Sequence, residues 1–246
     1  MRGIETPEDN LNRTLAEQRD YYRARAAEYD EWFLRQGRYD HGEEANARWR
    51  ADVEQVRAAL DAAPLTGQVL EFASGTGLWT ERIARTADRV TALDAAPETI
   101  AIARERLASG GLAQKVEFEE ADLFAWRPEP GRARAYDGAF MGFWLSHVPE
   151  ERLDPFLSAV AASLRPGGRV FIVDNRRQPT SSSPDQPLAA PGDAFMTRRL
   201  NDGRTFRIVK VFREPAALAA AFARHGIDLR VEETSTYFQY GLGRAE

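Results

Sequence analysis

The chain has 246 residues, a hydrophobic content of 43% and a formal net charge of −5. This length and apolar content suit one large α/β domain with a single core and argue against a disordered chain. The absence of cysteine excludes disulfides, thiolate metal sites and cysteine nucleophiles, and the acidic balance argues against a nucleic-acid partner.

The sequence contains no apolar run of bilayer length, and its polar start MRGIETPEDN is unlike a signal peptide. We therefore expect a cytoplasmic protein that does not bind membranes. No residue pattern indicates a metal site, and the sequence is compatible with a homodimer.

Two helices are expected before the first strand. One runs from Asn12 to about Arg35, and the second runs from Glu43 to Ala62 and ends before Pro64. Together, residues 12–62 are expected to form a helical lid.

Short apolar strands alternate with helices over residues 67–175. The strands are expected at Gln68–Ala73, Arg89–Asp94, Val116–Glu119, Tyr136–Gly142 and Arg169–Asp174. The helices are expected at Leu78–Thr86, Pro97–Ser109 and Glu150–Leu164. This alternation indicates a parallel sheet with helices on both faces, the cofactor-binding core of a Rossmann-like, doubly wound α/β fold.

The remaining segments follow a different pattern. Residues 176–213 form an insertion, in which Arg176–Asp193 is expected to be a flexible loop and Arg204–Arg213 an exposed strand. Residues 214–246 are expected to form a helix, Glu214–Arg224, and an antiparallel pair, Asp228–Ser235 with Tyr237–Arg244. The whole chain is thus expected to be a single domain around a seven-stranded, mostly parallel sheet.

Small residues follow the first expected strand in VLEFASGTG (Val69–Gly77). They let a ligand lie against the backbone at a helix N-terminus, where N–H groups are unpaired. Asp94 ends the second strand, where an acid can hold both hydroxyls of a ribose. Asp122 follows the third strand, where a carboxylate can accept a hydrogen bond from an adenine amino group.

The segment from Val69 to Asp174 resembles the class I S-adenosylmethionine methyltransferases. The resemblance rests on the E-x-A-S-G-T-G turn, the two aspartates, the aromatic-rich Met141–His147 and LRPGGRVFIVD. It implies S-adenosylmethionine as cofactor and a set of contacts to its methionine, ribose and adenine parts: Glu71, Ala73, Gly75, Gly77, Trp79, Asp94, Ala95, Asp122 and Leu123. Because Ala73 stands where the family usually has glycine, its φ is expected to be negative.

A nicotinamide dehydrogenase is the rival interpretation of this end of the sheet. It would require G-x-G-x-x-G, whereas the spacing here gives Ala73, Gly75 and Leu78, and it has no evident use for Asp122. A non-catalytic cofactor-binding partner would be expected to lack the nucleotide-binding acids, yet Glu71 and Asp94 are present as well.

The segment Phe143–His147 leaves the fourth strand at the end where ligands bind in such sheets. His147 is a candidate general base or hydrogen-bond partner of the methyl acceptor, and Trp144 is a candidate acceptor contact. The alternative is that His147 only caps or packs near a helix start.

Spacings of three and four place Tyr22, Arg25, Tyr29 and Trp32 on one face of the first helix. We expect Tyr22 and Tyr29 to act in catalysis as part of the lid, since buried phenol hydroxyls need polar partners. For Trp32 and Phe33, packing on the core is an equally good interpretation.

Residues 198–213 contain one acid and six basic side chains: Arg198, Arg199, Arg204, Arg207, Lys210 and Arg213. On an extended strand Arg204 and Lys210 share a face, and Lys210 is one of only two lysines in the chain. Such a cluster suits a carboxylate or phosphonate acceptor, with Arg198, Arg199, Arg204 and Lys210 as candidate contacts. The alternative is a solvated edge strand whose charges prevent aggregation.

A narrower resemblance covers most of the chain. The segments YYRARAAEYD, EFASGTGLWT, HVP and RRLNDGRTFRIVKVFREPAAL are similar to phosphonate O-methyltransferases of dehydrophos biosynthesis. This resemblance implies O-methylation of a small anion in secondary metabolism. Two alternatives stay open, a neutral natural-product hydroxyl or amine and a nucleic acid, although MGFWLSHVP lacks the Asn/Asp-Pro-Pro-aromatic segment common in base N-methylation.

Overall fold

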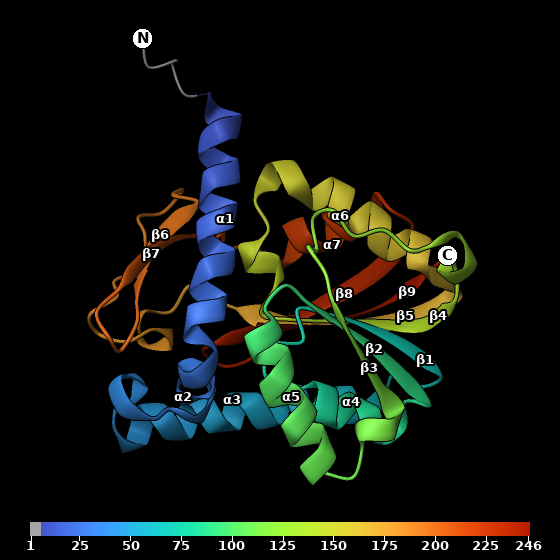
Figure 1. Cartoon of the computed structure of the whole chain (residues 1–246), viewed down its shortest axis with the longest axis horizontal. Helices are drawn as coiled ribbons and strands as arrows, with labels where there is room; N and C mark the ends of the chain where they lie inside the picture. Colours follow the sequence, from blue (N-terminus) through green and yellow to red (C-terminus); the bar gives the residue numbers. More distant parts are fainter. Residues whose placement is uncertain (1–5) are drawn as a thin grey trace.

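The computed structural model describes residues 6–246. Its centre is a seven-stranded sheet in the order β3-β2-β1-β4-β5-β9-β8, with helices on both faces (Figure 1). This arrangement confirms the expected Rossmann-like, mostly parallel sheet with a helical region at the N-terminus.

Five parallel strands form one side of the sheet: β1 (Gln68–Phe72), β2 (Arg89–Asp94), β3 (Val116–Glu120), β4 (Tyr136–Gly142) and β5 (Leu164–Asn175). The last two strands, β8 (Ile227–Glu233) and β9 (Phe238–Ala245), pair antiparallel with each other, and β9 pairs antiparallel with β5. All five parallel strands therefore end at the same edge of the sheet, where ligands bind in open α/β folds.

The structure contains seven α-helices within residues 6–246: α1 (Pro7–Arg25), α2 (Tyr29–Leu34), α3 (Glu43–Ala62), α4 (Thr80–Thr86), α5 (Pro97–Ser109), α6 (Glu150–Ser163) and α7 (Pro215–Ala223). None of them is long and apolar enough to cross a bilayer. Helices α3 and α4 cover one face of the sheet, and α6 and α7 cover the other (Figure 1). Each face carries its own buried apolar cluster.

The N-terminal helix differs from the expectation of one helix up to Arg35. It begins at Pro7, where the Thr6 and Asp9 side chains form a reciprocal capping box, and α1 ends at Arg25. A single 3₁₀ turn, Ala26–Glu28, separates it from α2. The capping box can be recognised in the sequence TPED. The break between α1 and α2 cannot, because the turn Ala26–Glu28 contains no glycine or proline.

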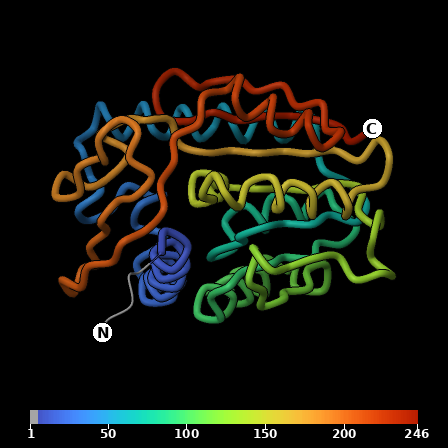
Figure 2. The backbone as a smooth tube through the Cα atoms, turned by 90° about the horizontal axis from the view of Figure 1, so that it is seen from above, coloured from blue at the N-terminus to red at the C-terminus, as the bar shows by residue number. Residues whose placement is uncertain are grey.

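The insertion also differs from the expected single exposed strand. It forms a separate antiparallel hairpin of β6 (Phe195–Arg199) and β7 (Thr205–Val209). Met196 and Ile208 of this hairpin are buried against Tyr21 of α1. Figure 2 shows α1 between the hairpin and the core of the fold. The hairpin is therefore not fully exposed, because α1 covers the Met196 and Ile208 side chains.

The segment 176–193 is mostly loop, as expected, but it contains a 3₁₀ turn, Pro179–Ser181, and its residues Ser182 and Gln186 are buried. Strand β5 begins at Leu164, five residues before the expected start, and takes in the Pro-Gly-Gly segment. The other expected elements agree with the structure to within two residues at each end.

Candidate active site

A cavity of about 700 Å³, partly open to solvent, lies at the carboxyl ends of β1, β2 and β4 beneath α1. It brings together most of the residues that the sequence assigned to a nucleotide. Its lining is Gln18, Arg19, Tyr22, Tyr29, Ala73, Gly75, Asp94, Ala95, Ala96, Thr99, Asp122, Leu123, Phe124, Gly142, Phe143, Trp144 and His147.

Asp94 ties the turn after β1 to the end of β2. Its carboxylate accepts hydrogen bonds from the backbone N–H of Gly75 at 2.7 Å and of Ala96 at 2.9 Å, and from Thr99 Oγ1 at 3.1 Å. Burial raises the pKa of Asp94, and these hydrogen bonds oppose that shift. A carboxylate has about four lone-pair sites, so Asp94 keeps the capacity to accept from a ligand hydroxyl.

Ala73 was expected to have a negative φ, and that expectation was wrong: its φ is +57°. Phe143, just after β4, has a φ of +56°. A left-handed conformation costs an L-residue about 1–2 kcal/mol. Both residues line the cavity, so the strain lies at the ends of β1 and β4, two of the strands that border it.

The two glycines of the turn have different surroundings. Gly75 has a φ of +55° and lies against Tyr29, whose ring would be 3.7 Å from an added Cβ. Gly77 lines none of the cavities described here. A Cβ on Gly77 would lie 3.0 Å from the Cβ of Ala103, so this glycine permits close packing of the turn on α5.

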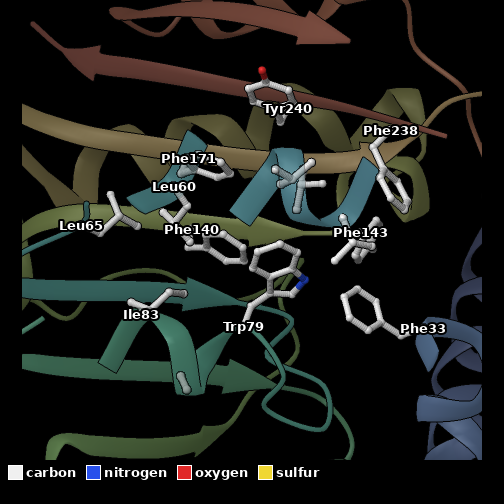
Figure 3. Close-up of a cluster of buried hydrophobic side chains, with 14 of the residues drawn as sticks. Phe33, Leu60, Leu65, Trp79, Ile83, Phe140, Phe143, Phe171, Phe238 and Tyr240 are labelled. Carbon is white, nitrogen blue, oxygen red and sulfur yellow. The ribbon is translucent and has the colours of Figure 1, made fainter. Parts of the chain in front are cut away.

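A second space of about 330 Å³ continues the first beside Ala73 and Phe143. It is lined by three side chains that each have a buried polar atom without a hydrogen-bond partner among residues 6–246: Glu71 Oε2, Ser74 Oγ and Trp79 Nε1. Figure 3 shows Trp79 beside Phe140, its indole nitrogen directed toward Phe33 and Phe143. Burial raises the pKa of Glu71 to about 8. A ligand with an ammonium and a carboxylate would supply partners for these groups.

Helix α1 is tied across the mouth of the first cavity by ion pairs. Arg19 lies 2.7 Å from the carboxylate of Asp122, and Arg23 lies 3.2 Å from Glu98 on α5. The sequence had assigned Asp122 to adenine but gave no sign that an arginine of α1 reaches it. Asp122 still lines the cavity, with Leu123 buried beside it.

A third space, of about 520 Å³, lies between α1, the insertion and the end of β5, and we call it the acceptor cavity. Its lining is Tyr21, Tyr22, Arg25, Tyr29, Trp32, Tyr39, Phe143, His147, Asn175, Ser181, Ser182, Gln186, Arg198, Lys210 and Phe212. Tyr22, Tyr29, Phe143 and His147 also line the first cavity, so they form the wall where the two spaces meet.

Three cations line the acceptor cavity: Arg25, Arg198 and Lys210. Among residues 6–246, no carboxylate lines it. Lys210 is buried behind Phe212 and donates hydrogen bonds to Ser146 Oγ at 2.7 Å and Asn175 Oδ1 at 3.1 Å. Burial lowers the pKa of Lys210 to about 8, although Asp174, 3.9 Å from its Nζ, favours the charged form.

His147 and Tyr22 form a hydrogen-bonded pair in the wall. His147 Nδ1 lies 2.8 Å from the carbonyl oxygen of Val209, which can only accept, so Nδ1 carries the proton. His147 Nε2 therefore accepts from the Tyr22 hydroxyl at 2.8 Å. Burial, with the charge of Lys210, places the pKa of His147 well below its ordinary value, and burial raises that of Tyr22. Both groups are neutral at physiological pH.

Two arginines assigned to the acceptor lie outside these cavities. Arg199 is exposed at the end of β6, and Arg204 is exposed and pairs with Asp202 at 2.7 Å. Arg199 is the last residue of β6 and Arg204 directly precedes β7, so both lie near the tip of the hairpin. Arg204 and Lys210 were also expected to share one face of a strand. They do not, because β7 runs from Thr205 to Val209 and contains neither residue. Trp144 lines the first cavity rather than the acceptor cavity.

Several lining residues were not assigned from the sequence. Arg25 was placed on the aromatic face of the first helix without a role, and its guanidinium lies 4.9 Å from the centre of the Tyr29 ring. Asn175 follows Asp174 at the carboxyl end of β5, a position that could have marked it. Ser182 and Gln186 fall in the expected loop, and both accept hydrogen bonds from Arg198 Nη1.

Comparison with known proteins finds methyltransferases. Residues 69–168 match the family described as "Methyltransferase domain". The chain is 30% identical over 198 residues to the ubiquinone biosynthesis O-methyltransferase of Xanthomonas axonopodis pv. citri, covering 75% of this chain and 77% of that protein. It is 33% identical over 168 residues to the enzyme of the same name from Xylella fastidiosa, covering 68% and 63%.

Solved structures agree over nearly the whole chain. The DhpI-SAM-HEP complex superposes with a TM-score of 0.72 and 38% identity, covering 94% of this chain and 97% of that one. The DhpI-SAH complex gives a TM-score of 0.71 and 37% identity over the same shares. With the cavity at the strand ends and its unpaired polar groups, these matches show that the chain belongs to the S-adenosylmethionine-dependent methyltransferases.

Proposed function

We propose that this enzyme methylates an oxygen of a small anionic molecule, a carboxylate or a phosphonate. The observation that carries the proposal is the acceptor cavity, where Arg25, Arg198 and Lys210 meet without a carboxylate among the described lining residues. Lys210 has Asp174 at 3.9 Å, but neither Arg25, which is buried, nor Arg198, which is partly buried, forms an ion pair within residues 6–246. Cations removed from water without paired anions are costly, and an anionic ligand supplies the missing partner. The names of the curated relatives, O-methyltransferases, support transfer to oxygen.

In this proposal, the cofactor occupies the first cavity and the second space beside Ala73 and Phe143. S-adenosylmethionine, when bound, supplies a methyl group activated on a sulfonium. Glu71 and Trp79 would hold the ammonium and carboxylate of its amino-acid end, and Asp94 would accept from the ribose hydroxyls. Ala95, Asp122 and Leu123 would surround the nucleoside, with Asp122 shared between adenine and Arg19.

The wall between the two cavities is the place of methyl transfer in this proposal. A carboxylate or phosphonate oxygen is already a nucleophile, so the enzyme needs to position it and to exclude water rather than to remove a proton. Tyr22, Tyr29 and His147 line both spaces and would orient the acceptor oxygen. Helix α1, with its ion pairs across the cofactor cavity, would act as the lid.

A second candidate is methyl transfer to a neutral hydroxyl. The observation in its favour is the neutral His147, whose Nε2 has a free-base lone pair that now accepts from Tyr22. In that reaction His147 would take the hydroxyl proton, directly or through Tyr22.

Calorimetric titration of propionate and 1-propanol into the complex with S-adenosylhomocysteine distinguishes an anionic acceptor from a neutral hydroxyl. Propionate is expected to bind and propanol is not. Since Lys210 has a pKa of about 8 and binds the anion in its protonated form, propionate affinity should be constant below that pH. Above it, affinity should fall by roughly tenfold per pH unit, because the protonated fraction of the lysine falls by that factor.

The charged groups around Lys210 are Asp174 on β5, Arg198 on β6 and Arg25 on α1. Propanol binding better than propionate, or propionate affinity that stays flat through pH 9, would contradict an anionic acceptor held by Lys210.

A further inference from the structure

Gln18 is a polar residue of the first cavity that has no part in the reaction as described so far. It is only 3% exposed, and it lies on α1 one turn before Tyr22. Because residues four apart share one face of a helix, α1 presents both side chains to the same side. Both side chains contact His147: Gln18 forms a hydrogen bond with its backbone, and Tyr22 forms one with its ring.

The orientation of the Gln18 amide is fixed by its two partners. Gln18 Oε1 accepts from the backbone N–H of Val209 at 2.9 Å, and a backbone N–H can only donate. Gln18 Nε2 donates to the carbonyl oxygen of His147 at 3.3 Å, and a carbonyl oxygen can only accept. Exchange of the amide oxygen and nitrogen would break both hydrogen bonds. An ionised carboxylate of the same length could form only the first of them.

These contacts close a ring of hydrogen bonds around His147. Its Nδ1 donates to the carbonyl oxygen of Val209, the same residue whose N–H is held by Gln18. The histidine belongs to a 3₁₀ turn, Leu145–His147, and Val209 ends β7 of the hairpin. Helix α1 lies between the hairpin and the core of the fold (Figure 2). Gln18 therefore joins the histidine to the strand whose carbonyl fixes its ring.

We propose that Gln18 is a positioning residue for the pair of His147 and Tyr22. By holding Val209 and the His147 backbone together, it keeps the ring proton of His147 on Nδ1 and leaves Nε2 to accept from Tyr22. The Tyr22 hydroxyl is thereby fixed at the wall between the two cavities before an acceptor binds, and such preorganisation favours reaction. This inference rests on the proposed function, in which methyl transfer takes place at that wall.

Nuclear magnetic resonance of the protein with isotope-labelled histidine nitrogens, bound to S-adenosylhomocysteine, measures the tautomer of His147. Its signals are identified by their loss in His147→Gln. The wild-type protein is expected to carry the ring proton on Nδ1. Gln18→Met keeps the length of the side chain but removes the amide, and it is expected to give a mixture of the two tautomers. A wild-type protein with the proton on Nε2 would overturn the proposal, even if the variant failed to fold.

Glu17 provides a matched control, because it also joins α1 to β7. Its Oε1 accepts from the backbone N–H of Arg207 at 2.5 Å, and within residues 6–246 it forms no hydrogen bond with His147. Glu17→Met therefore removes a comparable link between helix and strand, and it should leave the tautomer of His147 unchanged. The same change of tautomer in both variants would reflect a general loosening of α1 and would overturn the specific role of Gln18.

Methyl transfer from S-adenosylmethionine to ethylphosphonate provides the second readout. Gln18→Met is expected to lower kcat by about tenfold or more, because a misplacement of about 1 Å can cost about 100-fold in rate. Affinity for S-adenosylhomocysteine should change less than kcat, although Gln18 lines the first cavity. A folded Gln18→Met protein that loses only this affinity, or that keeps both kcat and the tautomer, would overturn the proposal.

The proposed function fails in a different way. A wild-type protein that methylates neither ethylphosphonate nor propionate would contradict the anionic acceptor, whatever the tautomer of His147. The tautomers of the wild-type protein and the two variants would still show whether Gln18 positions the histidine, so the two failures are distinguishable.

Discussion

Replacement of Lys210 by alanine is expected to lower kcat/KM for an anionic acceptor by about 30-fold or more. Lys210 is buried, and removing one partner of a buried charge pair costs about 2–5 kcal/mol, where 1.4 kcal/mol is tenfold. Cofactor affinity should hardly change, because Lys210 lines the acceptor cavity but not the first cavity. Steady-state kinetics, with calorimetry of S-adenosylhomocysteine, measures both quantities.

Lys115 provides the matched control. It is the other lysine of the chain, and its Nζ donates to the carbonyls of Ala84 and Ala87, away from the cavities described here. Lys115→Ala is expected to affect stability rather than kcat/KM. An unchanged kcat/KM in Lys210→Ala, or an equal loss in cofactor affinity, would contradict the assignment of Lys210 to the acceptor.

Asp94→Ala is expected to weaken S-adenosylhomocysteine binding by about 1–3 kcal/mol, roughly 5- to 150-fold. Two causes act together: the ligand hydroxyls lose their acceptor, and the N–H groups of Gly75 and Ala96 lose the carboxylate that fixes the turn. Asp88, exposed just before β2, is the control position for Asp88→Ala. Calorimetry that gives the same affinity for Asp94→Ala and the wild-type protein would remove Asp94 from the cofactor site.

The cofactor end of the fold could be predicted closely because its signals are local. Asp94 ends β2, Asp122 lies two residues beyond the end of β3, and parallel strands end at one edge of the sheet. Asp94 and Asp122 therefore had to meet near Gly75, and the structure places all three on one cavity. The conformation of Ala73 could not be predicted, since sequence says only which φ is easy and the turn after β1 demands a strained one.

The acceptor end depends on contacts between distant segments. The scarcity of lysine singled out Lys210, and strand alternation paired it with Arg204, because no sequence signal showed that β7 ends at Val209. The polar composition of residues 176–193 predicted a loop, yet Gln186 is buried there by contact with Arg198. Only packing against α1 and the hairpin reveals which of the basic residues face the cavity.

The most direct measurement is transfer of a labelled methyl group from S-adenosylmethionine to a mixture of small acceptors. The mixture contains propionate, ethylphosphonate, phenol, 1-propanol and propylamine at equal concentration, and mass spectrometry identifies the labelled products. The cationic cavity of Arg25, Arg198 and Lys210 leads us to expect label in the methyl esters of propionate or ethylphosphonate. Label found only in the phenol, alcohol or amine products would contradict an anionic acceptor.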